Sequence, residues 1–154
     1  MAIGDICKRD VAFAGRETTS QAAAKLMRHY HVGSLVVIDQ NDGRRKPVGI
    51  VTDRDLVVEI YALDLDPTVI TIGDIMTTEL VTVPESFGVM ETTQLMRMKG
   101  IRRVPVVDGD GNLVGIVTVD DVLQVLAEEL TEVARTVPHE QSREVRMRML
   151  FQSV

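Results

Sequence analysis

Two stretches of the chain carry apolar residues three and four positions apart, and each follows residues that can cap a helix. The first stretch comes after Thr18–Ser20 and the second after Ser86, with Gly33 and Gly100 at their far ends. Apolar residues at this spacing line one face of a helix, and glycine is favoured where a helix ends. We therefore predict two helices that begin at these hydroxyl residues and end at these glycines.

Runs rich in β-branched residues flank the two helices and predict short strands. Turns rich in Asn, Asp and Gly lie between the runs, at 41–43 and 109–112. A second amphipathic helix follows the last strand of each series. The predicted strands and second helices cover residues 11–13, 34–39, 48–51 and 53–62 in the first series, and 80–83, 103–108, 114–117 and 119–132 in the second.

The two series are copies of one unit. A shift of 69 residues places Ile3–Ile6 on Ile72–Ile75, and a shift of 66 residues places Val48–Thr52 on Val114–Thr118. The difference between the two shifts falls in a turn, where insertions are tolerated. One such small sheet cannot cover its own apolar face, so we expect the copies to pack against each other about a pseudo-twofold axis.

The predicted fold is therefore α+β, built from two α/β-type repeats that each contain a small sheet and two helices. Pro67 favours an irregular linker, and Pro138 is expected to end the helix before it. The spacing of Glu144 and Arg148 favours a helix in the tail, which we expect to dock on its own module or on a second subunit. The predicted segments are repeat 1 (1–64), a linker (65–71), repeat 2 (72–132) and a C-terminal tail (133–154).

Both repeats end in the motif Gly-Ile-Val-Thr-x-x-Asp, at Gly49–Asp55 and at Gly115–Asp121. Together with the run Val104–Thr118, these motifs resemble the tandem CBS domain pair, or Bateman module, and especially its small stand-alone bacterial members. The resemblance extends from Ile3 to Leu130. It implies two CBS repeats, assembly into flat dimers and a regulatory role. Other members of that family carry the module fused to a catalytic domain, such as the barrel of inosine monophosphate dehydrogenase.

In each motif the threonine ends a strand and the aspartate lies in the first turn of the next helix. The pairs are Thr52 with Asp55 and Thr118 with Asp121. Three residues are nearly one helical turn, so both side chains can face the helix N-terminus, whose free N–H groups suit a phosphate. A carboxylate there can also accept both hydroxyls of a ribose. Simple helix capping is the alternative explanation, whereas the resemblance implies that the aspartate holds the ribose and the threonine lies near it.

Three arginines are candidates for phosphate binding, because a guanidinium pairs with phosphate oxygens in a planar fork. Arg102 and Arg103 precede the central strand of the second repeat, and Arg54 lies inside the first motif. Solvated surface charge is the alternative for each. The first repeat has Gly33–Ser34 at the position of the arginine pair, so the two predicted sites should differ in affinity.

The resemblance also implies an apolar slot for the base, formed by the leading strand and the start of the central strand. Ordinary core packing is the alternative for the residues of this slot. The candidates are Ala12, Phe13, Ser34, Leu35, Val81, Thr82, Val83, Val104 and Pro105.

The composition argues against several other functions. A net charge of −6 disfavours a nucleic-acid partner, and no apolar run is long enough to span a membrane, so we expect a cytoplasmic protein. Cys7 is the single cysteine, which excludes an intrachain disulfide and favours a small buried residue over a reactive thiol. His29 and His31 are poorly spaced for a metal, so we predict no metal site. The chain has no Ser-His-Asp order and no Walker-type loop, and we predict that it is not an enzyme.

We hypothesise that the protein is a regulatory sensor of an adenine nucleotide. AMP, ADP and ATP are the expected ligands, and NAD and S-adenosylmethionine are alternatives that contain the same adenosine group. Binding between the repeats would change the conformation or the assembly of the protein, which we expect to be a homodimer, or would act on a regulated enzyme or transporter. No catalytic cofactor is expected. The alternative hypothesis is a ligand-independent scaffold for interaction and dimerisation, with degenerate pockets.

Overall fold

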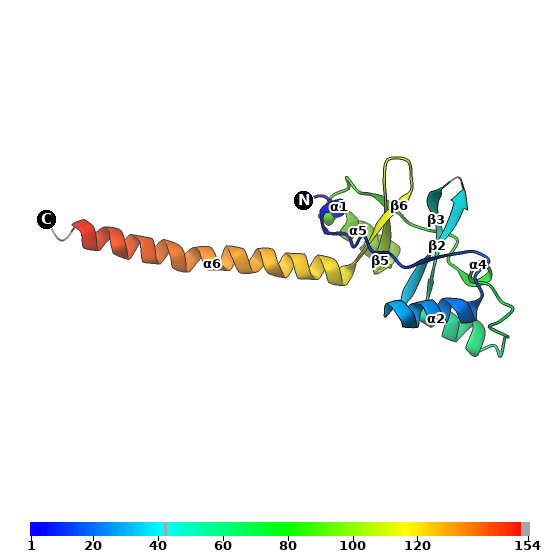
Figure 1. The fold of residues 1–154 in the computed structure, drawn as a ribbon. Helices are drawn as coiled ribbons and strands as arrows, with labels where there is room; N and C mark the ends of the chain where they lie inside the picture. Colours follow the sequence, from blue (N-terminus) through cyan, green and yellow to red (C-terminus); the bar gives the residue numbers. More distant parts are fainter. Residues whose placement is uncertain (42, 152–154) are drawn as a thin grey trace.

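Each half of the chain folds into a three-stranded sheet (Figure 1). The computed structural model describes residues 1–41 and 43–151, so Asp42 of the predicted turn and residues 152–154 of the tail lie outside the described residues. In each sheet the first strand is parallel to the second, and the second is antiparallel to the third. This arrangement confirms the predicted α+β fold with two small sheets. The strands are β1 (Phe13–Gly15), β2 (Ser34–Asn41) and β3 (Arg44–Thr52), followed by β4 (Val83–Pro84), β5 (Arg103–Val107) and β6 (Leu113–Thr118).

Helix α2 (Ser20–Tyr30) begins where the sequence predicts and ends earlier. The hydroxyl of Thr19 accepts a hydrogen bond from the N–H of Ala22 at 3.2 Å, which caps the first turn. The predicted end at Gly33 is wrong, because His31 already takes the left-handed conformation, with φ of 54°. In that conformation the N–H of His31 closes the last turn of the helix.

Helix α5 (Val89–Lys99) ends at Gly100, as predicted, with the glycine in the left-handed conformation at φ of 66°. Its predicted start at Ser86 is wrong, because Gly88 is the capping residue. The N–H of Gly88 donates to the carboxylate of Glu91 at 2.9 Å. An acidic side chain in the first turn therefore determines where this helix begins.

The second helices of the two halves differ in form and length. The predicted helix over 53–62 consists of α3 (Asp53–Asp55) and the π-helical segment η1 (Leu56–Tyr61). Its counterpart α6 (Val119–Phe151) has 33 residues, so the predicted end at residue 132 is wrong. Pro138 does not end the helix either. A proline removes one backbone hydrogen bond, and the helix continues on both sides of this residue. Most of α6 projects away from the rest of the molecule (Figure 1).

The short helices α1 (Ile3–Ile6) and α4 (Ile72–Ile75) exchange places between the two halves. The first residue of α1 donates its N–H to the carbonyl of Phe87 at 2.7 Å, and the first residue of α4 donates to the carbonyl of Thr18 at 2.8 Å. Both residues are fully buried, each in the core of the other half. The two halves are therefore interlocked.

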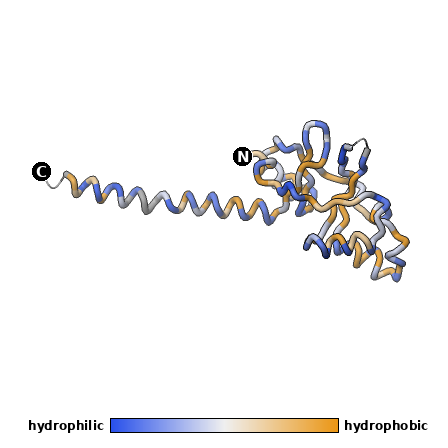
Figure 2. Tube along the Cα trace, in the orientation of Figure 1, coloured by the Kyte–Doolittle hydropathy of each residue, from blue (hydrophilic) through white to orange (hydrophobic). Residues whose placement is uncertain are grey.

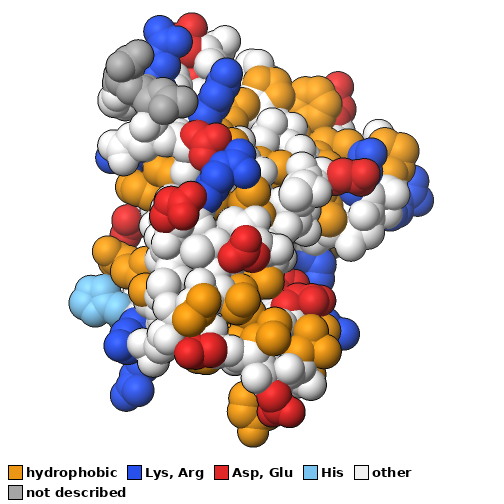
Figure 3. Space-filling view, turned by 90° about the vertical axis from the view of Figure 1, so that its right-hand side faces the viewer, with side chains coloured by type: hydrophobic (Ala, Val, Ile, Leu, Met, Phe, Trp, Pro, Cys, Tyr) orange, Lys and Arg blue, Asp and Glu red, His pale blue; other side chains and the backbone are white. Residues whose placement is uncertain are grey.

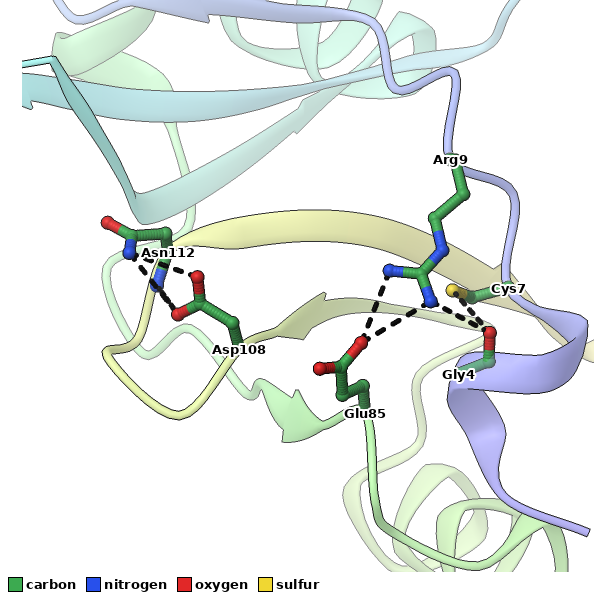
Figure 4. Close-up of polar contacts among 6 residues, drawn as sticks. All are labelled: Gly4, Cys7, Arg9, Glu85, Asp108 and Asn112. Carbon is green, nitrogen blue, oxygen red and sulfur yellow. Dashed lines mark hydrogen bonds and ion pairs between the residues drawn. The ribbon is translucent and has the colours of Figure 1, made fainter.

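Two groups of polar contacts hold surface loops of the second half (Figure 4). The guanidinium of Arg9 donates to the carboxylate of Glu85 at 3.3 Å and to the carbonyl of Gly4 at 3.0 Å, which holds the exchanged N-terminal segment in place. In the turn between β5 and β6, Asp108 accepts hydrogen bonds from the backbone N–H of Asn112 at 2.8 Å and from its side chain at 3.1 Å. These bonds lower the pKa of Asp108 below its usual value.

The two sheets meet at the centre of the molecule. Val36 and Ile38 of β2 form a buried cluster with Leu113 of β6, so residues from both halves share one core. The predicted packing of the two repeats against each other is confirmed.

Cys7 is buried in the core of the second half, and this burial raises the pKa of its thiol.

Candidate functional site

A cleft of about 230 Å³ opens between the two halves, beside the start of α3. The first half contributes Thr52 and Asp55, and the second half contributes Arg102 and Arg103. The structure therefore brings one predicted Thr–Asp pair together with the predicted arginine pair. The residues that line the cleft are Ile50, Thr52, Asp55, Thr77, Glu79, Leu80, Val81, Ile101, Arg102 and Arg103.

Thr52 and Asp55 bond to each other across the first turn of α3. The N–H of Thr52 donates to Oδ2 of Asp55 at 2.8 Å, and the N–H of Asp55 donates to the hydroxyl of Thr52 at 3.1 Å. This reciprocal capping is the alternative that the sequence left open. It engages only one carboxylate oxygen, because Oδ1 of Asp55 has no hydrogen-bond or ion-pair partner among the described residues. Capping therefore leaves this carboxylate able to accept further hydrogen bonds.

Thr118 and Asp121 form the same capping contact at the start of α6. The N–H and the hydroxyl of Thr118 donate to Oδ2 of Asp121 at 2.9 and 2.6 Å. Here the other oxygen is also engaged, since the ammonium of Lys8 lies 2.8 Å from Oδ1 of Asp121. Burial of Asp121 opposes its ionised form, but the Lys8 and Thr118 contacts outweigh burial and hold the pKa below its usual value.

The three predicted phosphate-binding arginines lie in two different places. Arg102 and Arg103 lie along the cleft, and the side chain of Arg102 is 76% exposed, with its guanidinium 3.5 Å from Asp120. Such an exposed ion pair is weak, so this guanidinium can turn to another anion. Arg54 is exposed and does not line the cleft.

The predicted base-binding residues also separate into groups. Val81 lines the cleft beside Asp55. Ala12 and Phe13 line a different depression of about 200 Å³, together with Asp10, Val11, Tyr30 and Val32. Thr82 and Ser34 are half-buried and line neither cavity. The side chains of Leu35, Val83, Val104 and Pro105 are fully buried in the core and offer a ligand no surface.

Sequence reasoning missed several residues that the structure places at the two Thr–Asp pairs. Thr77, Leu80 and Ile101 line the cleft, and Lys8 contacts Asp121. The sequence contained a signal for Lys8 and Thr77, because the repeat shift of 69 residues aligns these two residues. Their proximity to the aspartates depends on the exchange of the short helices, which has no local signature.

Within the described residues, no three His, Cys, Asp or Glu side chains are grouped so as to hold a metal ion. None of the helices in that part of the chain combines the length and the apolar character that a membrane crossing requires.

Proteins of similar sequence come from several organisms. An uncharacterized protein of Methanopyrus kandleri is 39% identical over 125 residues, which are 81% of this chain and 62% of that protein. Hypoxic response protein 1 of Mycobacterium tuberculosis is 34% identical over 124 residues, which are 80% of this chain and 84% of that protein. The chain therefore spans less than two thirds of the Methanopyrus relative.

Solved structures share the fold. Hypoxic response protein I, solved with two coordinated zinc ions, has a TM-score of 0.70 at 33% identity over 80% of this chain and 98% of its own. A CBS domain pair in complex with 5′-methylthioadenosine and S-adenosyl-L-methionine has a TM-score of 0.72 at 28% identity over 84% of this chain and 98% of its own. The model of the CBS domain family matches residues 3–62 and 72–128. With one match in each half, the chain belongs to the CBS domain family and contains a tandem pair of these domains.

Proposed function

We propose that the cleft at Asp55 binds an adenine nucleotide and that the protein is a regulatory sensor. The observation that carries this proposal is the meeting of two groups in one cleft, a carboxylate with an unengaged oxygen among the described residues and an arginine pair. Asp55 accepts hydrogen bonds from the ribose hydroxyls, and Arg102 and Arg103 pair with phosphate. Leu80 and Val81 provide apolar surface for the base.

The size of the cleft agrees with this division of roles. Its volume of about 230 Å³ is below the range of roughly 300–1,000 Å³ that is usual for ligand pockets. A nucleoside therefore fills the enclosed part, and the phosphates extend to the rim. The exposed Arg102 lies where such phosphates would emerge. AMP, ADP and ATP all satisfy this arrangement, because they differ only in the part outside the cleft.

Both repeats contribute residues to the cleft, and this supports a regulatory role. Asp55 belongs to the first repeat and Arg102 to the second, so a bound nucleotide contacts both repeats and favours the arrangement in which they face each other. The likeness to a CBS pair solved with two adenosine compounds supports this class of ligand. We infer that the recipient of the signal is the protein's own assembly or a regulated enzyme or transporter.

The proposal includes a homodimer formed through α6. Leu123, Leu126, Leu130 and Val133 are spaced three and four residues apart, and each is at least 44% exposed. Hydrophobic residues recur along the projecting part of this helix (Figure 2). On the face of the molecule opposite α6, hydrophobic side chains are interspersed with acidic ones (Figure 3).

The charges on α6 favour a second copy of the same helix as the partner. Glu128, Glu129 and Glu132 lie in its first half. The second half carries three arginines and two glutamates, a net charge of +1; they are Glu140, Arg143, Glu144, Arg146 and Arg148. An antiparallel pair of α6 helices places each acidic half beside a basic half of the other copy. A parallel pair would place like charges together.

Thermal unfolding against AMP, ADP, ATP and S-adenosylmethionine tests nucleotide binding. Circular dichroism or an extrinsic dye is required, because the chain has no tryptophan. A ligand at 100 times its Kd stabilises a fold by about 2.7 kcal/mol, which is a measurable shift. We expect at least one nucleotide to raise the midpoint of the wild type and of Asp121→Ala, but not that of Asp55→Ala. If no adenosine compound shifts the wild type, or if Asp55→Ala shifts equally, the proposed function is wrong.

A further inference from the structure

Lys8 and Thr77 occupy equivalent positions in the two halves. Each lies two residues after an exchanged helix and pairs with a strand that ends in a Thr–Asp motif. Lys8 exchanges two backbone hydrogen bonds with Ile116, at 2.9 and 3.0 Å, and the N–H of Thr77 donates to the carbonyl of Ile50 at 3.1 Å. Thr77 lines the cleft in the first half, so Lys8 stands at the matching place beside Asp121.

The Lys8 ammonium contacts Oδ1 of Asp121, whereas the equivalent Oδ1 of Asp55 in the first half has no partner among the described residues. It lies 2.8 Å from Oδ1 of Asp121, a side chain that is only 10% exposed, and Oδ2 already accepts two bonds from Thr118. The equivalent Oδ1 of Asp55 has no partner among residues 1–41 and 43–151. A ribose hydroxyl at Asp121 would have to displace a charged donor. A hydroxyl carries no charge, so this exchange gives up the Coulomb attraction between the ammonium and the carboxylate and is unfavourable.

Among the described residues, the side of the molecule around Asp121 also differs from the first cleft in the groups that would face a phosphate. Gly33–Ser34 take the place of the arginine pair. The carboxylate of Asp53 lies 3.2 Å from the position where a side chain on Gly33 would begin. The neighbouring depression of about 200 Å³ is lined by Asp10 and not by Asp121. Carboxylates repel phosphate, and this side lacks the arginine pair that offsets Glu79 in the first cleft, so a ligand without phosphate is the one that suits it.

From this asymmetry, and on the basis of the proposed function, we infer that Lys8 blocks a second ligand site at Asp121, so that each chain binds one nucleotide, at Asp55. The substitution Lys8→Thr should free Asp121 and open a second site for adenosine. The substitution introduces the residue that the other half has at the same place. The side chain of Lys8 is 67% exposed, so Lys8→Thr is expected to fold, which circular dichroism checks.

Isothermal titration calorimetry with adenosine counts the sites in four proteins. They are the wild type, Lys8→Thr, the double variant Lys8→Thr/Asp121→Asn, and Lys25→Thr, which removes the charge of an exposed lysine on α2 that lines neither cavity. We expect Lys8→Thr to bind one more equivalent of adenosine than the wild type. The double variant and Lys25→Thr should bind as many as the wild type. An unchanged count in Lys8→Thr overturns the inference, and so does a wild type that binds two equivalents.

The reciprocal change tests the same contact at the first cleft. Thr77→Lys places an ammonium beside Asp55 and should weaken AMP binding at least tenfold, whereas Thr78→Lys, at an exposed position outside the cleft, should not. Equal AMP affinity of Thr77→Lys and the wild type overturns the inference. Titration of the wild type with AMP, ADP, ATP and S-adenosylmethionine separates the two proposals. If none of them binds, the proposed function fails, and the adenosine count of Lys8→Thr alone then decides whether Lys8 blocks a site.

Discussion

Asp55 and Asp121 are equivalent residues that acquire different properties from their neighbours. Each accepts a hydrogen bond from the N–H of the threonine three residues before it, at 2.8 and 2.9 Å. Only Asp121 has an ammonium within 2.8 Å, that of Lys8. The difference between a carboxylate that can bind a ligand and one that is already engaged therefore depends on one residue more than a hundred positions away in the sequence.

The Lys8–Asp121 pair makes stability depend on pH. The pKa of Asp121 is lowered in the folded protein. The pair therefore stabilises the fold above the unfolded pKa of about 3.9, and the contribution is lost as the pH falls through the lower, folded value. We expect the wild type to have a higher free energy of unfolding than Lys8→Thr at pH 7, with a smaller difference at pH 3, below the unfolded pKa. Urea unfolding at both pH values measures this difference. A difference as large at pH 3 as at pH 7 would show that the ion pair is not its source.

At the scale of the elements, the exchanged segments pass so closely over the last strand of each sheet that only glycine fits beneath them. A Cβ atom on Gly49 of β3 would lie 2.5 Å from the sulfur of Met76 and 2.8 Å from the carbonyl oxygen of Thr77. A Cβ atom on Gly115 of β6 would lie 2.5 Å from the sulfur of Cys7. Neither glycine has a positive φ, so the requirement is for space and not for backbone freedom.

We therefore expect Gly49→Ala and Gly115→Ala each to lower the free energy of unfolding by about 1–3 kcal/mol, the usual cost of overpacking. Gly15→Ala is the matched control in β1, because nothing lies within 4 Å of its added Cβ atom. Urea unfolding compares the three variants with the wild type. Equal stability of all three would mean that the exchanged segments can move away from the sheets without cost.

Helix ends show how far local patterns predict the elements. The hydroxyl cap at Thr19 and the glycine end at Gly100 lie where the sequence indicates. The ends at His31 and Gly88 were missed, because a left-handed histidine and a glutamate in the first turn can substitute for the residues that usually mark a helix end. The length of α6 was underestimated because the repeat ended at residue 132 and Pro138 was expected to stop any helix before it.

At the scale of the whole molecule, the exposed stripe on α6 makes the assembly state testable. Leu130 is 70% exposed at the centre of the stripe. We expect the wild type to be a dimer and Leu130→Glu to be a monomer, because the substitution replaces apolar surface in the helix pair with a charged side chain that must give up its hydration on burial. Thr131→Glu adds the same charge on an adjoining face and should remain a dimer. Light scattering after size exclusion measures the mass of each. A monomeric wild type, or equal dissociation of both variants, would contradict pairing through α6.

The sequence by itself determined the duplicated unit and most of the strands and helices, and it offered capping as one of two explanations for each threonine and the aspartate three residues later. These features depend on spacing within one turn of helix or one strand, and such spacing can be read from the order of residues. Only the tertiary structure decided that α1 and α4 change places, that Asp55 meets Arg102 and that Asp121 meets Lys8. The same fold buried Leu35, Val83, Val104 and Pro105, which the resemblance had suggested for a base slot. Contacts between residues far apart in the chain depend on how whole elements pack, and neither periodicity nor a motif in one repeat specifies which neighbour the other repeat supplies.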